Sequence, residues 1–329
     1  MNMNFSLYNP FEDLIFDDHF CFLSGALTTE TISVFPEWIL DRFQFGEERI
    51  EVIDKMKSFR FADLRMPAAP HVIDALNKLD ATFKKAFDEG FESMAALDEK
   101  IIFLWTGRIV YGLIYLELTY ERSRLIKEGK DFSLSPYLKR RFSMFHLMLQ
   151  SLIAPVEFKG RKPWSITVFP LKYSADIFTY RDDTVNLLFQ MGVNGFGMVV
   201  CFQDNGMLKE RMQAILEKMK GHVLHPLQFE ELYAHFHYLD YILQQKPEYQ
   251  FEEKEDALII EALPMEPKDG RPIFGFWDDN IFAQLLANYW SVYGIEREDI
   301  LQFQKPRLSY LENAYTKEFI LPESIELPF

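Results

Sequence analysis

One short stretch of the chain, HVLHPLQFEELYAHFH (residues 222–237), holds four histidines and two adjacent glutamates. Imidazole and carboxylate groups are ligands that zinc and iron take in proteins. If the stretch is helical after its proline, Glu231 and His235 lie one turn apart on the same face. His235 and His237 would point about 200° apart, which argues against one ion binding both. The candidate metal ligands are His222, His225, Glu231 and His235. The alternative is a helix-entry turn with surface and interface histidines.

The stretch HFCFLSGALTTETISVFPEWI (residues 19–39) has the character of a metal-binding turn followed by an apolar run. A treble-clef zinc site needs two pairs of ligands, each pair on a tight turn, so that four donors converge on one ion. The corresponding positions here are Cys21, Ser24, Ala69 and Val72. Because the cysteine alone among these four can bind zinc usefully, the sequence predicts the shape of the site without its ligands.

Residues 19–80 resemble an HNH-type endonuclease module, which is a ββα-metal nuclease built on a treble clef. In that family a CxxCG turn precedes an apolar stretch with Glu-His, and a CxxCN turn then enters a helix. The first turn and the run VFPEWI (residues 34–39) match this pattern in spacing and apolar character. Val34 stands where the general-base histidine would stand, and Ile73 replaces the asparagine. An imidazole must activate the water in such a site, and valine cannot do so.

The resemblance implies a short hairpin followed by a helix that begins near His71, with no bound metal, no cofactor and no nuclease activity. The alternative is that these residues are the core of an unrelated fold. The expected domains are a degenerate HNH-like segment at residues 1–90 and a helical and antiparallel-sheet domain at residues 91–329.

The basic residues of this acidic chain gather in one segment. The formal net charge is −15, which argues against general attraction to nucleic acid. Residues 122–172 nevertheless hold eleven Lys or Arg against three acidic residues, so the segment carries +8 and the remainder −23. One interpretation is a solvated face that pairs with acidic surface elsewhere. The other is a phosphate-contacting strip on one face, formed by Lys139, Arg140, Arg141, Arg161 and Lys162.

The composition is that of a globular protein with a large core. Of the 329 residues, 48% are hydrophobic and 16% aromatic, which suits one large or two ordinary domains. Two cysteines cannot form a disulfide framework, and the first residues lack a basic region followed by an apolar core, so we expect a cytoplasmic protein. The apolar run at residues 101–120 contains Arg108 and Glu117, which favours a buried helix over a membrane span.

The elements that position these residues follow from apolar periodicity. Spacings of three and four predict helices over residues 72–89, 93–127, 136–151, 207–220, 226–245 and 280–293. Residues 164–202 alternate short apolar runs with turns, which is typical of an antiparallel meander. GVNGFG (residues 192–197) lies between two such runs and opens no helix, so it predicts a hairpin turn rather than a phosphate loop. A further strand is expected at residues 257–263.

The predicted fold class is α+β: an N-terminal degenerate treble-clef-like segment, a helical middle and an antiparallel β-meander flanked by helices. We expect a pseudo-nuclease that acts by binding, either nucleic acid through its basic segment or a protein partner, rather than by catalysis. One alternative is a metal-dependent hydrolase that uses the histidine-rich stretch. Another is a structural or assembly protein, whose many aromatic residues contribute an apolar interface.

Overall fold

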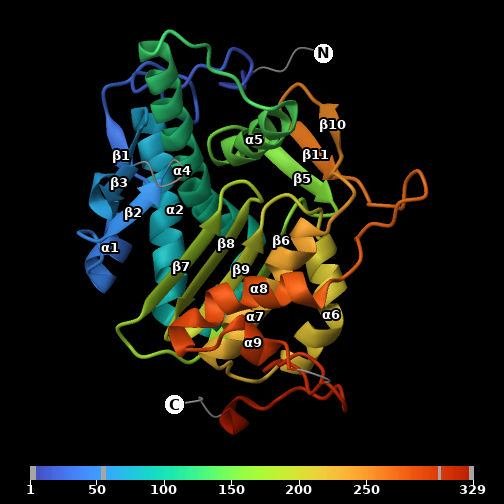
Figure 1. The fold of residues 1–329 in the computed structure, drawn as a ribbon. Coiled ribbons are helices and arrows are strands. Elements are labelled where there is room, and N and C mark those ends of the chain that lie inside the picture. Colours follow the sequence, from blue (N-terminus) through green and yellow to red (C-terminus); the bar gives the residue numbers. More distant parts are fainter. Residues whose placement is uncertain (1–4, 53–56, 303–304, 326–329) are drawn as a thin grey trace.

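The computed structural model describes residues 5–52, 57–302 and 305–325 (Figure 1). A four-stranded antiparallel sheet lies at the centre of the molecule, with helices against both of its faces. Short strands of the N-terminal segment lie beside one edge of this sheet, and a smaller sheet lies near its other end (Figure 1). The α+β class predicted from the sequence is confirmed.

The central sheet consists of β6 (Ser165–Leu171), β7 (Phe178–Asp183), β8 (Leu188–Val193) and β9 (Gly195–Cys201). Its strand order is β6-β9-β8-β7. The predicted meander is confirmed for β7, β8 and β9, whereas β6 pairs with β9 rather than with its neighbour in sequence. This is a Greek-key arrangement, in which a longer connection brings one strand to the far side of the hairpins. The strands β6 and β7 are therefore the two edges of the sheet.

The helices form two layers. The first layer contains α2 (Pro70–Glu89), α3 (Phe91–Ala96), α4 (Glu99–Lys127) and α5 (Pro136–Leu149). The second contains α6 (Met207–Met219), α7 (Pro226–Tyr241), α8 (Asp279–Trp290) and the short α9 (Arg297–Ile300). The predicted helices are confirmed with one correction. The helix expected over residues 93–127 is two helices, because Asp98 caps α4 by accepting a hydrogen bond from the Lys100 amide at 2.8 Å.

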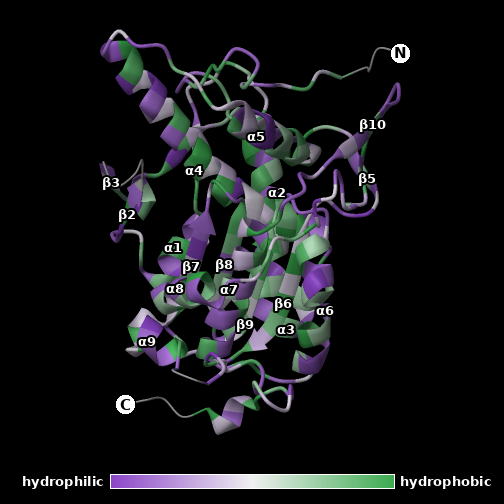
Figure 2. Ribbon diagram, turned by 45° about the vertical axis from the view of Figure 1, so that its right-hand side comes forward, coloured by the Kyte–Doolittle hydropathy of each residue, from purple (hydrophilic) through white to green (hydrophobic). Residues whose placement is uncertain are grey.

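Alternate side chains of the sheet enter two separate cores. Ile166 and Phe189 pack with the first helical layer, whereas Phe169 and Leu188 pack with the second. Because both faces are covered, β8 and β9 are buried along nearly their whole length, whereas the edge strand β7 carries polar residues and is largely purple in Figure 2. The first core joins apolar residues from both sides of residue 90. The expected division into domains at that residue stays a prediction.

The N-terminal segment contains β1 (Thr31–Ser33), α1 (Glu37–Phe43), β2 (Arg49–Val52), β3 (Lys57–Arg60) and β4 (Arg65–Pro67). The strand β1 pairs antiparallel with β4, and β2 pairs with β3. The start of α2 at Pro70 confirms the expected helix near His71. A short hairpin does form at the turn of residues 21–25, where an antiparallel bridge joins Phe20 and Leu27. The strands β1 and β4 are connected differently, through α1 and the β2–β3 hairpin.

The smaller sheet has the order β10-β11-β5, with β5 (Val156–Gly160), β10 (Tyr249–Glu253) and β11 (Leu258–Ala262). The strand β11 confirms the strand expected at residues 257–263, and it pairs in parallel with β5. This sheet lies beside α5 (Figure 1).

The helix α4 is the core helix that the apolar run at residues 101–120 predicts. By length and composition this helix could cross a membrane, but 89% of its 18-residue apolar stretch is buried inside the protein. Arg108 is 3% exposed, and its NH1 pairs with Asp80 Oδ2 of α2 at 2.6 Å. Its NH2 donates to the Ser33 carbonyl of β1 at 2.7 Å. The guanidinium therefore fastens α4 to α2 and to the N-terminal segment.

Candidate functional site

The four candidate metal ligands do not converge on one point. His225 caps α7, where its Nδ1 accepts a hydrogen bond from the Leu227 amide at 3.2 Å. His222 lies in the loop before that helix, and His235 Nε2 is 3.8 Å from Glu231 Oε1 on the helix itself. Among the described residues, no group of three or more His, Cys, Asp or Glu side chains is arranged to hold a metal ion.

Glu231 is occupied by structural hydrogen bonds. Its Oε2 accepts from the amides of Tyr310 at 2.6 Å and Leu311 at 3.1 Å, and its Oε1 accepts from Ser309 Oγ at 2.6 Å. These donors hold the C-terminal part of the chain against α7. The geometry therefore supports the alternative interpretation of the histidine-rich stretch, a helix-entry turn with interface histidines.

The five basic residues do not share one face. Successive positions on α5 point about 100° apart. Lys139 Nζ donates to a main-chain carbonyl of the N-terminal segment at 3.2 Å, and Arg141 donates to one in the β7–β8 turn at 2.6 Å. Arg161 pairs with a glutamate of α6 at 3.0 Å, and Lys162 is exposed. The expectation of one strip is corrected by these contacts, although Arg140 and Arg141 line one pocket together.

The residues at the nuclease-like positions belong to the core. Cys21, Val34, Ala69 and Val72 are buried, and Ser24 and Ile73 are half-buried. A main-chain hydrogen bond holds the turn at residues 21–25 in place: the Phe22 amide donates to the Pro67 carbonyl at 2.9 Å. The carbonyl of Phe22 lies 3.0 Å from His146 Nε2. Apolar packing and hydrogen bonds thus hold this segment in place.

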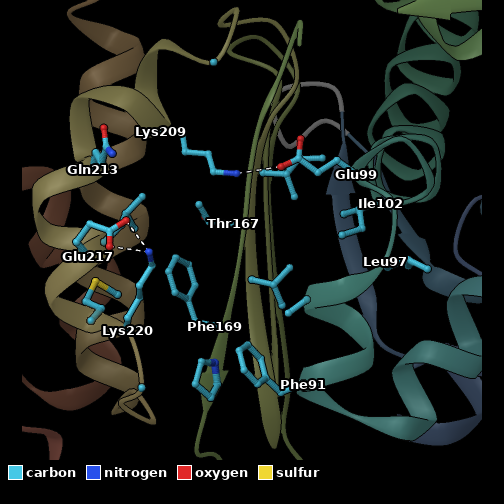
Figure 3. Close-up of a pocket in the computed structure, with 18 of the residues that line it drawn as sticks. Phe91, Leu97, Glu99, Ile102, Thr167, Phe169, Lys209, Gln213, Glu217 and Lys220 are labelled. Carbon is cyan, nitrogen blue, oxygen red and sulfur yellow. Dashed lines mark hydrogen bonds and ion pairs between the residues drawn. The ribbon is translucent and has the colours of Figure 1, made fainter. Parts of the chain in front are cut away.

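A groove of about 620 Å³ runs along one edge of the central sheet (Figure 3). Its floor is β6, one wall is α6, and the other wall comes from α3 and the start of α4. Phe91, Leu97 and Ile102 line the α3 and α4 side, and Leu216 and Met219 line the α6 side. Figure 3 looks onto the edge of the sheet, with a helical wall on each side. The groove is therefore the position that a further strand of this sheet would take.

Main-chain hydrogen-bonding groups of β6 face this groove and have no partner among the described residues. Successive residues of a strand turn their N–H and C=O groups to opposite sides. At the end of β6, the Pro170 carbonyl accepts from the Leu224 amide at 2.8 Å, and the Lys172 amide donates to the Leu224 carbonyl at 3.2 Å. Both contacts lie on the side away from β9. Ile166 and Val168 occupy the same set of alternate positions, so their N–H and C=O groups also point away from β9. Within the described residues, these groups form no hydrogen bond.

Both ends of the groove are closed. Lys209 Nζ of α6 and Glu99 Oε1 of α4 form an ion pair of 2.9 Å that crosses the sheet edge (Figure 3). Trp164 Nε1 donates to the second Glu99 oxygen at 3.1 Å. At the other end, Leu224 pairs with the last residues of β6. The open part of the strand is residues 166–169, which span about 13 Å at roughly 3.3 Å per residue.

A buried carboxylate sets the position of α6 beside β6. Asp204 Oδ2 accepts from Ser165 Oγ at 2.5 Å and from the Leu208 amide at 2.8 Å. The Ser165 hydroxyl in turn accepts from the Lys209 amide at 3.0 Å. Burial raises the pKa of Asp204 to about 6. One side of the groove therefore depends on this carboxyl group.

The charged side chains at the rim are neutralised by one another. Besides the ion pair that crosses the edge, Lys220 pairs with Glu217 at 2.6 Å, and Glu210 pairs with Arg161 at 3.0 Å. The groove is thus largely apolar between paired charges.

The opposite edge of the sheet is covered by the N-terminal segment. Phe45 stacks on Phe178 of β7 with 5.0 Å between ring centroids, and Phe35 meets Tyr180 edge-on at 5.1 Å. Of the two edges, β6 is therefore the one that faces a groove.

A buried polar network between β7, α7 and α8 has no counterpart in the sequence analysis. His237 Nε2 lies 3.2 Å from Asp183 Oδ2, and His237 Nδ1 lies 2.5 Å from Tyr289 Oη. Burial acts to raise the pKa of Asp183, but hydrogen bonds from His237 and Asn186 outweigh it and lower the pKa to about 2. Burial raises the pKa of the nearby Asp240 to about 6. The sequence drew attention to His237, but it gave no indication that the partner of His237 is Asp183 on β7.

Comparison with protein-family models, with curated proteins and with solved structures finds no match to this chain. The contacts of the groove itself are therefore what bear on its function. One feature of the sequence identifies β6, the floor of the groove, as an edge strand. Pro170 ends the run SITVFP, and proline within a sheet is confined to edge strands, strand starts and bulges.

Proposed function

We propose that this protein acts by binding rather than by catalysis, and that it takes an extended segment of a partner protein as an added strand beside β6. The observation that carries the proposal is the set of unpaired N–H and C=O groups of Ile166 and Val168 at the floor of a largely apolar groove. Such groups at a sheet edge are a template for another strand. Adding a strand to an exposed edge is a common mode of peptide recognition.

A short peptide segment fits the groove better than a second copy of this chain. The helical walls flank the edge of β6, so the sheet of another copy, with its own helices, would meet α6 and α3 before its strands could pair. A stable interface between two globular proteins buries on the order of 1,200 Å² or more. The four open residues at 166–169 offer far less, but they match an extended segment of four or five residues.

The walls define the side chains that such a segment carries. Alternate side chains of an added strand would point to opposite faces of the sheet. One set would meet Leu216 and Met219 on α6, and the other would meet Phe91 and Ile102 on the opposite wall. Because the rim charges are already paired, the groove favours an uncharged segment with apolar, β-branched residues on both faces.

Selection of random heptapeptides displayed on phage against the full chain tests this proposal. Synthetic copies of the enriched peptides are then titrated by calorimetry into the wild type, into Leu216→Glu in the groove wall and into Leu27→Glu. Leu27 is a matched control, because it is 76% exposed and lies in the N-terminal segment. We expect binding to the wild type and Leu27→Glu, and loss of binding to Leu216→Glu. Failure to enrich any sequence, or equal binding to both variants, would contradict the proposal.

We further propose that residues 19–80 are a metal-free remnant of an HNH-like module that now serves as scaffold in a cytoplasmic protein. The support is chemical: Val34, Ala69 and Val72 have no donor atoms in their side chains, and a lone Cys21 thiolate cannot hold zinc where three or four protein ligands are needed. Elemental analysis and a plasmid-nicking assay with Mg²⁺, Mn²⁺ or Zn²⁺ test this. One zinc per chain, or cleavage lost on mutation within these residues, would overturn it.

A further inference from the structure

A second pocket, of about 360 Å³, lies between α5 and β10 and is lined by cations and aromatic rings. Arg140 and Arg141 come from α5, and Lys246 comes from the loop that follows α7. Tyr137 of α5 is 42% exposed, and Phe251 of β10 is 44% exposed. Two exposed rings and three positive charges thus surround one cavity.

The positive charge of this pocket is poorly neutralised. In the described part of the chain, neither Arg140 nor Lys246 forms an ion pair with a carboxylate, and Lys246 Nζ instead lies 5.0 Å from the centroid of the Tyr137 ring. Asp240 Oδ1 is the carboxylate oxygen paired with Arg141, at the long distance of 3.8 Å from NH2. The pocket therefore favours a negatively charged ligand.

Two buried polar groups beside the cavity lack partners. The Arg141 side chain is 9% exposed, and it donates from NH1 to Tyr137 Oη at 2.8 Å and from NH2 to the Asn186 carbonyl at 2.6 Å. Within residues 5–52, 57–302 and 305–325, its Nε has no hydrogen-bond partner, and neither has the buried hydroxyl of Tyr249. Buried polar groups are normally satisfied, because leaving one unpaired costs the full desolvation of the group. Both residues line the pocket, but these two atoms are buried, so the cations free to contact a ligand there are Arg140 and Lys246.

We propose that this pocket binds a nucleotide, meaning a flat ring that carries a phosphate group. The ring would stack on Phe251, which is 44% exposed, as bases stack on aromatic side chains. The phosphate oxygens would accept hydrogen bonds from Arg140 and Lys246, and the buried Arg141 would add its positive charge. The net charge of −15 opposes a long polyanion, which favours a single nucleotide over a nucleic-acid strand. This site is independent of the groove at β6.

Calorimetric titration with adenosine monophosphate, adenosine and inorganic phosphate tests the ligand class. We expect adenosine monophosphate to bind at least tenfold more tightly than either part alone, because ring and phosphate contacts act together. Equal affinity for inorganic phosphate would show an anion site and overturn the nucleotide proposal. Equal affinity for adenosine would remove the role of the cations, and no saturable binding at millimolar concentrations would remove the site.

Variants then test the residues. Arg140→Ala and Lys246→Ala should each weaken binding of adenosine monophosphate about tenfold or more, because each removes a charge-assisted hydrogen bond. Lys85→Ala removes an exposed cation of α2 and should leave affinity unchanged. Asp240→Asn removes the carboxylate beside Arg141 and should tighten binding severalfold, a gain that a folding defect cannot produce. Unchanged affinity in the first two variants, or weaker binding in Asp240→Asn, would overturn the proposal.

Discussion

Replacing Val168 by proline tests the open edge of β6 while leaving its hydrogen bonds to β9 in place. The Val168 N–H faces the groove, so proline removes a donor that the ladder with β9 does not use. Proline at Thr167 would remove an N–H that faces β9 and would disrupt the ladder. Because successive N–H groups of a strand point to opposite sides, proline should be tolerated at Val168 and should destabilise the fold at Thr167.

The expected loss of peptide affinity follows from one main-chain hydrogen bond. A bound strand would lose the bond from the Val168 N–H and would be left with a buried carbonyl without a donor, which costs about 1–3 kcal/mol. At roughly 1.4 kcal/mol for each factor of ten, the dissociation constant should rise about 5- to 140-fold. The free energy of unfolding should fall by little more than in Val168→Ala, because both variants lose the same side-chain contacts.

Urea unfolding and calorimetry with a selected peptide measure both quantities. Val168→Ala is the matched control, since it removes the branched side chain and keeps the N–H. We expect Val168→Ala to bind peptide, Val168→Pro to fold but bind peptide more weakly by the factor above, and Thr167→Pro to be strongly destabilised. Peptide binding by Val168→Pro with the affinity of Val168→Ala would refute the strand-addition reasoning.

Three further predictions concern the elements that hold the two sides of the sheet in place. Gly25 has φ +70°, and a Cβ there would meet Tyr8 Cδ2 at 2.4 Å, so Gly25→Ala should lower the free energy of unfolding by about 2 kcal/mol or more in a urea titration; an unchanged value would contradict the geometry of this turn. Arg108→Ala leaves Asp80 buried without its partner and should cost about 3–5 kcal/mol, and a loss below that of an exposed pair would show that the ion pair does not fasten α4. Asp204 has a pKa of about 6 against an ordinary value of 3.8, so the folded state binds this proton more tightly and the stability from this group falls as pH rises from about 4 to about 6. Between pH 5 and 7.5 the loss from this group is on the order of 1 kcal/mol, which Asp204→Asn should abolish; an identical pH dependence in wild type and variant would reject the assignment.

The elements of this fold were predictable from local pattern, but their pairing was not. Apolar spacing located α2, α6 and α7 to within a few residues at most ends, because each buries one stripe in the core. The partner of β6 depends on which strands meet after the chain has collapsed, and periodicity carries no information about that. The sequence therefore predicted an antiparallel sheet and placed β6 beside the wrong strand.

The functional residues were harder to predict for a related reason. The histidine-rich stretch drew attention to Glu231, which holds the C-terminal segment against α7, and to His235, which packs on the rings of Trp277 and Phe282. The hydrogen-bonded partner of His237 lies on β7. The groove is defined by main-chain groups whose residues, Ile166 and Val168, have ordinary apolar side chains. Such a site leaves little trace in residue type, and Pro170 was its one local sign.

Amide hydrogen exchange of β6, resolved by NMR, tests the central claim most directly. In the free protein we expect the amides of Ile166 and Val168 to exchange faster than those of Thr167 and Phe169, since only the amides of Thr167 and Phe169 point toward β9. Addition of a selected peptide should slow exchange at Ile166 and Val168 specifically. Equal protection of all four amides in the free protein, or no change at Ile166 and Val168 when peptide is bound, would contradict the proposal that β6 accepts a further strand.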